Sequence, residues 1–342
     1  MITAGLRRAI LVAAGREDAD PLLRPGPVPG SYASSLPFRL ARPGQDPRDQ
    51  AADLAGRLNG EPWIAAAEVT GTGFLTVTVT HEALAGLAVR IAQAGPACAE
   101  SDALRGRAVP APPPGPLAAA PGWPQARAAL AAQLTARLAA AAGATVIFHP
   151  ERAGLPALAP PSPALPGRAR LPAPPSLPAG GPVARAVAYA GEDAVRFALA
   201  RMPPGGEPPE AAVIARHVLA NPAYAVRYAH AAAAAVLRWA AALGTRPAGF
   251  TPRLLAEPVE LTLLDALSWL PERVAMAARR GRPDEFAGYL EELAARTIET
   301  MSTTSFTTIS SISSERLWLA DAARTGLAAS LELLGIGAPG RL

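Results

Sequence analysis

The chain has 342 residues, half of them hydrophobic and only 5% aromatic, a composition that favours packed helices over a sheet-rich sandwich. All 32 basic residues are arginine and Cys98 is the single cysteine, which excludes a lysine Schiff base, a disulfide framework and a thiolate metal cage. The formal charge of +4 lies in the middle of the chain, because residues 101–220 carry 11 arginines against 6 acidic residues whereas residues 221–342 carry 12 of each.

The sequence predicts no membrane span and no cleaved leader. Leu6 to Ala14 is a short apolar run that meets acidic residues without a small-residue cleavage site. The longest apolar run, Ala229 to Leu243, is interrupted by His230 and Arg238 and is too short to cross a bilayer. We therefore expect a soluble protein of the reducing cytoplasm, with no membrane partner.

Residues 1–95 predict a small α/β domain. A helix-like start is followed by Pro and Gly punctuation and by an amphipathic stretch near residues 46–58. Residues 68–80 alternate Thr with apolar side chains around a Gly-x-Gly turn, which predicts a half-buried strand or hairpin. Helical spacing returns over residues 81–94.

Residues 96–182 predict a proline-rich linker, since 18 of the 38 prolines fall between residues 101 and 182. Such runs cannot lie inside helices or central strands and favour polyproline II or disorder. Between them, residues 123–142 predict an alanine-rich helix and residues 145–148 a strand. Because one helix and one strand cannot bury a core alone, we expect this piece either to be part of the linker or to dock on its neighbours.

Residues 183–342 predict an all-α bundle, which makes the whole chain α+β. Apolar side chains recur at helical spacing in three segments. They are Leu261, Leu264 and Leu267; Phe286, Leu290, Leu293 and Ile298; and Leu317, Ala320, Leu327, Leu331 and Leu334. Gly335 stands where a left-handed C-cap is expected, and Asn221 before Pro222 predicts a capped helix start.

Four segments in order carry a family resemblance: residues 191–197 (GEDAVRF), 221–230 (NPAYAVRYAH), 289–294 (YLEELA) and 333–339 (LLGIGAP). Together they resemble the DALR-type anticodon-binding domain of arginyl-tRNA synthetases. Residues 30–34 (GSYAS) and 71–74 (GTGF) are similar to motifs of the same family's N-terminal domain, which contacts the outer corner of the tRNA. The resemblance implies that the chain binds tRNA, with tRNA-Arg as the natural candidate; no DNA is expected.

Tyr224 and Tyr228 are four residues apart with Arg227 between them, so we expect all three on one helical face. Rings beside a guanidinium suit stacking on unpaired bases and pairing with phosphates. The alternative is that the rings pack between helices and that the other arginines form a solvated helix end. The candidate tRNA contacts are Tyr32, Arg39, Tyr224, Arg227, Tyr228, Arg279, Arg280 and Arg282.

The family's catalytic domain uses a His-Ile-Gly-His motif, and none of the four histidines here falls in such a pair. The 87-residue window from 96 to 182 is also small for a domain. The resemblance therefore implies that its helix and strand are either linker or a degenerate remnant of the catalytic domain. We therefore expect no catalytic residue, no metal and no cofactor of its own, and a tRNA-binding adaptor or regulator that does not aminoacylate. Two alternatives stay open: a protein-interaction module that reuses the bundle, and an ATP-dependent arginine–tRNA ligase activity retained or completed in trans.

Residues 301–314 form a Ser/Thr tract where the family carries an aromatic segment after its Tyr-Leu helix. Such residues have low helix propensity, so the sequence predicts a mobile loop that lacks the family's base contacts.

Overall fold

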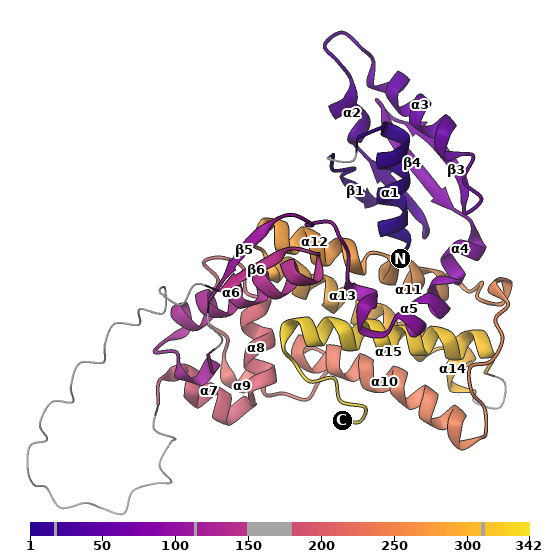
Figure 1. The fold of residues 1–342 in the computed structure, drawn as a ribbon. Coiled ribbons are helices and arrows are strands. Elements are labelled where there is room, and N and C mark those ends of the chain that lie inside the picture. The colour runs from indigo at the N-terminus through magenta and orange to yellow at the C-terminus, as the bar shows by residue number, and fades with distance from the viewer. Residues whose placement is uncertain (17–18, 113–114, 149–179, 309–311) are drawn as a thin grey trace, which may run out of the picture.

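The computed structural model describes residues 1–16, 19–112, 115–148, 180–308 and 312–342 (Figure 1). Its architecture is α+β, as predicted: a four-stranded sheet near the N-terminus, a two-stranded sheet in the middle and a C-terminal helical bundle. No helix within these ranges is both long and apolar enough to cross a membrane. His149 and two stretches of the predicted proline-rich linker, residues 113–114 and 149–179, lie outside the described residues.

The N-terminal unit is an antiparallel sheet with strand order β1-β2-β4-β3 and helices packed on it. Its elements are α1 (Ile2–Ala14), β1 (Leu23–Pro25), β2 (Ser31–Ser34), α2 (Leu36–Leu40), α3 (Pro47–Leu58), β3 (Ile64–Thr70) and β4 (Phe74–Val79). The predicted hairpin is confirmed, with Thr70 paired to Phe74 beside the turn. Gly73 in this turn has φ +130°, and a Cβ there would come within 2.8 Å of Pro47, so the close approach of α3 requires glycine.

Helices α4 (His81–Ala85) and α5 (Leu87–Ala94) and the 3₁₀ turn η1 (Gly95–Ala99) lead from the sheet to the bundle. Both α5 and η1 pack along α15 (Ser314–Leu334). Cys98 in η1 is fully buried, and this burial raises the pKa of its thiol to about 12. The single cysteine is therefore a packing residue.

The middle of the chain forms a parallel crossover. Strand β5 (Ala108–Ala111) pairs with β6 (Thr145–Phe148), and α6 (Trp123–Ala141) connects them. The predicted helix and strand are confirmed, and α6 docks on α8 (Glu192–Ala200) and α12 (Leu270–Arg280). Strand β5 was not predicted because it contains Pro110, which an edge strand tolerates.

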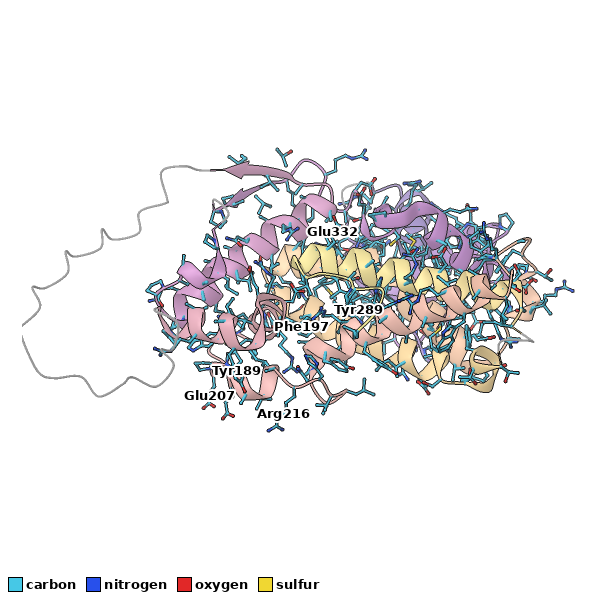
Figure 2. The ribbon with its side chains drawn as sticks, turned by 90° about the horizontal axis from the view of Figure 1, so that it is seen from below. Tyr189, Phe197, Glu207, Arg216, Tyr289 and Glu332 are labelled. Atoms are coloured by element: carbon cyan, nitrogen blue, oxygen red, sulfur yellow. The ribbon has the colours of Figure 1, made fainter. Side chains whose placement is uncertain are left out.

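The C-terminal part is the predicted helical bundle, centred on three long helices that contact one another: α10 (Pro222–Ala242), α13 (Pro283–Met301) and α15. The remaining elements are α7 (Pro182–Ala190), α9 (Ala211–Ile214), α11 (Pro258–Ser268) and α14 (Thr304–Thr307). Both predicted helix ends are confirmed, since the Asn221 side chain accepts from the Ala223 amide and Gly335 has φ +70°. Figure 2 shows Phe197 and Tyr289 among the helices, with Tyr189 at the outer edge.

The predicted loop over residues 301–314 is wrong in part, because α14 forms inside it. Phe306 is fully buried, and Ser305 Oγ donates to the Glu257 carboxylate at 2.5 Å. Ser313 caps α15 by accepting from the Arg316 amide. One aromatic side chain and local hydroxyl bonds therefore outweigh the low helix propensity of this composition.

The N-terminal unit docks on one face of α11 and α12. Ser268, at the end of α11, is fully buried; its carbonyl oxygen accepts from Thr3 Oγ1 and its Oγ accepts from the Tyr32 hydroxyl, both at 2.8 Å. The Tyr32 ring lies 5.3 Å from the Trp269 ring, centroid to centroid. This contact fixes β2 to the bundle.

A buried ion pair continues the same interface one helical turn further on. Arg7 of α1 donates to the two carboxylate oxygens of Glu272 at 2.6 and 2.8 Å, and it also reaches Asp20 at 3.1 Å. Asp20 in turn pairs with Arg279 near the end of α12. Burial raises the pKa of Asp20, but the Leu22 amide and the two guanidiniums lower it overall.

Candidate nucleic-acid interface

A groove of about 580 Å³ runs along the exposed face of α10. Tyr224 and Tyr228 line it, and their rings stack at 5.9 Å between centroids with 27° between planes. His217, just before the helix, stacks on the other side of Tyr224 at 5.5 Å and 12°. Three rings thus form a continuous stack at one end of the groove.

Trp239 continues the aromatic surface along the same helix. It follows Tyr228 by 11 residues, which is close to three helical turns, so both rings emerge on one face. The Tyr228 side chain is 38% exposed and that of Trp239 is 50% exposed. The sequence did predict Tyr224 and Tyr228, and helical spacing alone could have added Trp239.

Hydroxyl groups form the opposite wall of the groove. Ser302 and Thr307, from the Ser/Thr tract, line it together with Ile298 and Met301 at the end of α13. Their hydroxyls already donate to backbone carbonyls one turn earlier, which leaves oxygen lone pairs facing outward. The tract therefore supplies acceptors where the family carries aromatic groups.

The groove is weakly positive. Arg238 and Arg341 line it, and no acidic side chain does so within the described parts of the chain. Arg238 donates to the Gly340 carbonyl, whereas Arg341 has no hydrogen bond or ion pair with any described residue. Aromatic stacking with a small cationic contribution is the chemistry that single-stranded nucleic acid requires.

Arg227 is not among the residues that line the groove. Its Nε atom is buried and has no hydrogen-bond partner among the described residues. Arg227 is half-buried and does not line the groove with Tyr224 and Tyr228, so a contact of Arg227 with RNA stays a prediction.

Tyr32 is not available to RNA in this structure, whereas Arg282 is partly exposed and carries an ion pair. Tyr32 is fully buried and its hydroxyl is bound to Ser268, so its expected role is replaced by a packing role. Arg282 forms a two-pronged pair with Asp284 at 2.6 and 2.8 Å. For Tyr32, a tertiary partner satisfies the hydroxyl that the sequence leaves open, and a contact of Arg282 with RNA stays a prediction.

Arg39, Arg279 and Arg280 meet in a second concave surface, a cleft of about 630 Å³ that we call the junction cleft. It lies where the N-terminal unit meets α12, and α12 and α10 lie on opposite sides of α15 in Figure 1. Arg279 is engaged by Asp20, and Arg280, 58% exposed, pairs with Glu285 at 3.0 Å. The sequence-predicted cations thus gather away from the predicted tyrosines.

The described histidines are dispersed and each has a structural contact. His81 and His230 each lie 2.9 Å from a backbone carbonyl oxygen, and His217 stacks on Tyr224. Burial lowers the pKa of His230, which favours the neutral imidazole. Among the described residues, no cluster of side chains could hold a metal ion.

A third concave surface, of about 470 Å³, lies on the β5–α6–β6 crossover. Small apolar side chains line it, with Gln133, Arg137 and Arg196 as its polar groups. The lining within the described residues includes neither an imidazole nor a carboxylate. Arg196 is held by Glu192 at 2.6 Å.

Two sequence families match the ends of the chain. The model described as "DALR anticodon binding domain" matches residues 226–342, and the model described as "Arginyl tRNA synthetase N terminal domain" matches residues 1–79. The arginine–tRNA ligase of Clavibacter sepedonicus is 37% identical over 158 residues, which cover 44% of this chain and 28% of that protein. The ligase of Kineococcus radiotolerans is 41% identical over 128 residues, covering 36% and 23%. The chain thus spans about a quarter of the length of these relatives.

The fold is similar to a solved structure as well. Thermus thermophilus arginyl-tRNA synthetase aligns with a TM-score of 0.68 at 16% identity, with 100% of both chains covered. The fold and the two family matches together define the class of protein. It is a helical bundle of the anticodon-binding type with a small α/β unit at its N-terminus. The chain belongs to the arginyl-tRNA synthetase family, as the sequence motifs predicted.

Proposed function

We propose that this chain binds tRNA through the α10 groove, with tRNA-Arg as the first candidate, and acts as an adaptor or regulator. The aromatic stack carries the proposal, because Tyr224, Tyr228 and Trp239 line one groove, and two of the three, Tyr228 and Trp239, lie within residues 226–342, which match the anticodon-binding model. Each base stacked on an aromatic ring contributes about 1–3 kcal/mol. The few cations in the groove predict modest affinity with a shallow salt dependence.

Fluorescence anisotropy with labelled tRNA-Arg and a non-cognate tRNA tests the groove. We expect Tyr228→Ala and Trp239→Ala each to weaken binding by roughly 1–2 kcal/mol, about a five- to thirtyfold rise in Kd. Tyr189→Ala is the matched control, since Tyr189 is 68% exposed on α7 and does not line the groove. The proposal fails if the unaltered chain binds neither tRNA at micromolar protein and low salt.

We also propose that the chain does not ligate an amino acid to tRNA by itself. The dispersal of the described histidines and the lack of a His-Ile-Gly-His motif support this, because imidazoles at that motif stabilise the charge that develops on the transferred phosphate. Arginine-dependent exchange of pyrophosphate into ATP should be at background with the pure chain. Exchange above background would restore the ligase alternative, with ATP as its cofactor.

Nuclease treatment distinguishes the adaptor role from a protein-interaction module. Material captured from native lysate on the tagged chain should include tRNA, and its protein companions should be lost after nuclease treatment. A protein retained in stoichiometric amount after nuclease would instead favour the interaction module.

A further inference from the structure

The junction cleft is built from three separate segments of the chain. The N-terminal unit, the segment before β5 and helix α12 each contribute arginines to it. Its charged lining consists of Arg16, Arg24, Arg39, Arg107, Arg279 and Arg280, with the two carboxylates Asp20 and Glu272. Leu23 and Leu36 belong to its apolar floor. Counted over the described residues, six cations against two anions make this the most basic of the concave surfaces described above.

The two carboxylates are already engaged. Glu272 accepts from Arg7, and Asp20 accepts from Arg7 and Arg279. They therefore do not neutralise the remaining guanidiniums of the cleft.

Three of the cleft's arginine side chains have no partner among the described residues. The guanidiniums of Arg24, Arg39 and Arg107 form neither a hydrogen bond nor an ion pair with any described residue, and all three residues are exposed. Each comes from a different element or connection: β1, α2 and the segment before β5. Guanidiniums that converge from separate segments, with no counter-charge among the described residues, produce a positive potential that attracts anions from solution.

We propose that the junction cleft binds a compact ligand with two or more adjacent phosphates, such as a nucleoside triphosphate tail or inorganic polyphosphate. A guanidinium fork matches phosphate oxygens bidentately, and several forks suit several adjacent phosphates. The volume of about 630 Å³ lies in the range of small-molecule sites. An extended RNA backbone is instead followed by an open, elongated groove of cations, whereas here the cations converge on one hollow.

The ligand would bridge the two parts that form the cleft. Arg24 and Arg39 belong to the N-terminal unit and Arg280 to the bundle, so a bound polyphosphate adds to the Arg7–Glu272 contact between the same parts. A ligand that binds only the folded protein raises its melting temperature in a concentration-dependent manner. This inference does not depend on RNA binding by the α10 groove.

Calorimetric titration of the full chain with sodium tripolyphosphate tests the proposal. We expect saturable binding at low salt, tighter than for orthophosphate, and at least a tenfold rise in Kd in the double variant Arg39→Gln/Arg107→Gln. The matched control is Arg105→Gln/Arg253→Gln, which removes the same charge from side chains that are 79% and 85% exposed and do not line the cleft. Its Kd should be unchanged, and tripolyphosphate should raise its melting temperature as it does in the unaltered chain.

Four results would overturn the proposal. They are no saturable tripolyphosphate binding, equal affinity for orthophosphate, equal weakening in both double variants, and loss of tRNA binding in Arg39→Gln/Arg107→Gln without any tripolyphosphate binding. The last would assign the cleft to an RNA backbone.

Discussion

The two long faces of the bundle use the same residue types for opposite purposes. On α10, Tyr224, Tyr228 and Trp239 stay on the surface of a groove, with Tyr228 stacked and 38% exposed. On α11 and α12, an aromatic and polar face is buried against the N-terminal unit. Tyr32, which the N-terminal unit contributes to this contact, is fully buried. Both tyrosines were predicted to contact RNA, and only the partners across the interface separate them.

The difference lies in where each ring's polar atom is satisfied. The Tyr32 hydroxyl donates to Ser268 from a site without water access, so burial strongly raises the pKa of its phenol. The hydroxyl of Tyr228 has no such partner among the described residues, and its ring offers a face to the groove. An aromatic residue contributes to folding where its polar end is paired inside and to binding where it is not.

The largest expected effect comes from breaking the buried pair of the docking face. Glu272→Ala leaves Arg7, only 12% exposed, with Asp20 as its remaining partner, so we expect the free energy of unfolding to fall by about 3 kcal/mol. Urea unfolding measures this loss. The control Glu291→Ala removes the partner of Arg201, whose side chain is 47% exposed, and should cost about 1 kcal/mol or less. Equal losses in the two variants would mean that the interface does not bury its charges.

A smaller effect separates the two tyrosines directly. Tyr32→Phe removes the donor to the buried Ser268 hydroxyl and should lower the unfolding free energy by about 1–2 kcal/mol. Tyr228→Phe, on the exposed face, should stay within about 0.5 kcal/mol of the unaltered chain. In tRNA titrations Tyr32→Phe should leave Kd unchanged. If it weakened tRNA binding as strongly as Tyr228→Ala, the packing role assigned to Tyr32 would be wrong.

Much of the fold could be predicted because its signals are local. The Asn221 cap, the Gly335 stop and the Gly-x-Gly hairpin each act within a few residues, so the sequence around them is sufficient. The apolar stripe of α15 was also predicted, and Leu317 and Leu331 are fully buried. Helical spacing also predicted that Tyr224 and Tyr228, two of the three aromatic residues that line the α10 groove, share one face of the helix.

The rest depends on contacts between distant residues. Tyr32 and Ser268 are 236 positions apart, and no residue near Tyr32 in the sequence predicts that its ring is buried. The junction cleft likewise joins Arg24, Arg107 and Arg280 from three segments, so neither Arg24 nor Arg107 could be predicted from a local cluster. Strand β5 was also not predicted, because the proline runs around it exclude central strands whereas β5, which contains Pro110, pairs only with β6.

The smallest expected effect is a change of stability with pH. It comes from two aspartates of the docking interface, Asp265 and Asp20, whose pKa values are shifted in opposite directions. Asp265 of α11 accepts from the Gly30 amide at 2.9 Å, and burial, aided by Glu292, raises the pKa of its carboxyl. Well below pH 4 the carboxyl is protonated in both states. As the pH rises, the unfolded chain ionises first, so the contribution of Asp265 to stability falls until the pH passes its raised folded pKa. Asp265→Asn keeps an acceptor for Gly30 without the charge, so its stability relative to the unaltered chain should increase over this window and then level off.

Asp20 provides the opposite slope in the same interface. Its folded pKa is lowered, so its contribution is present above the ordinary value of 3.8 and is lost as the pH falls through the folded pKa. As the pH falls, the loss in unfolding free energy caused by Asp20→Asn should therefore become smaller. The gain in unfolding free energy caused by Asp265→Asn should become smaller as well. Urea unfolding of the three proteins between pH 3 and pH 7 measures both slopes. If the difference in unfolding free energy between Asp265→Asn and the unaltered chain did not change across that range, the Asp265 carboxyl would have the same pKa in the folded and unfolded states. The docking face would then be accessible to water, in contradiction to the buried contact around Ser268.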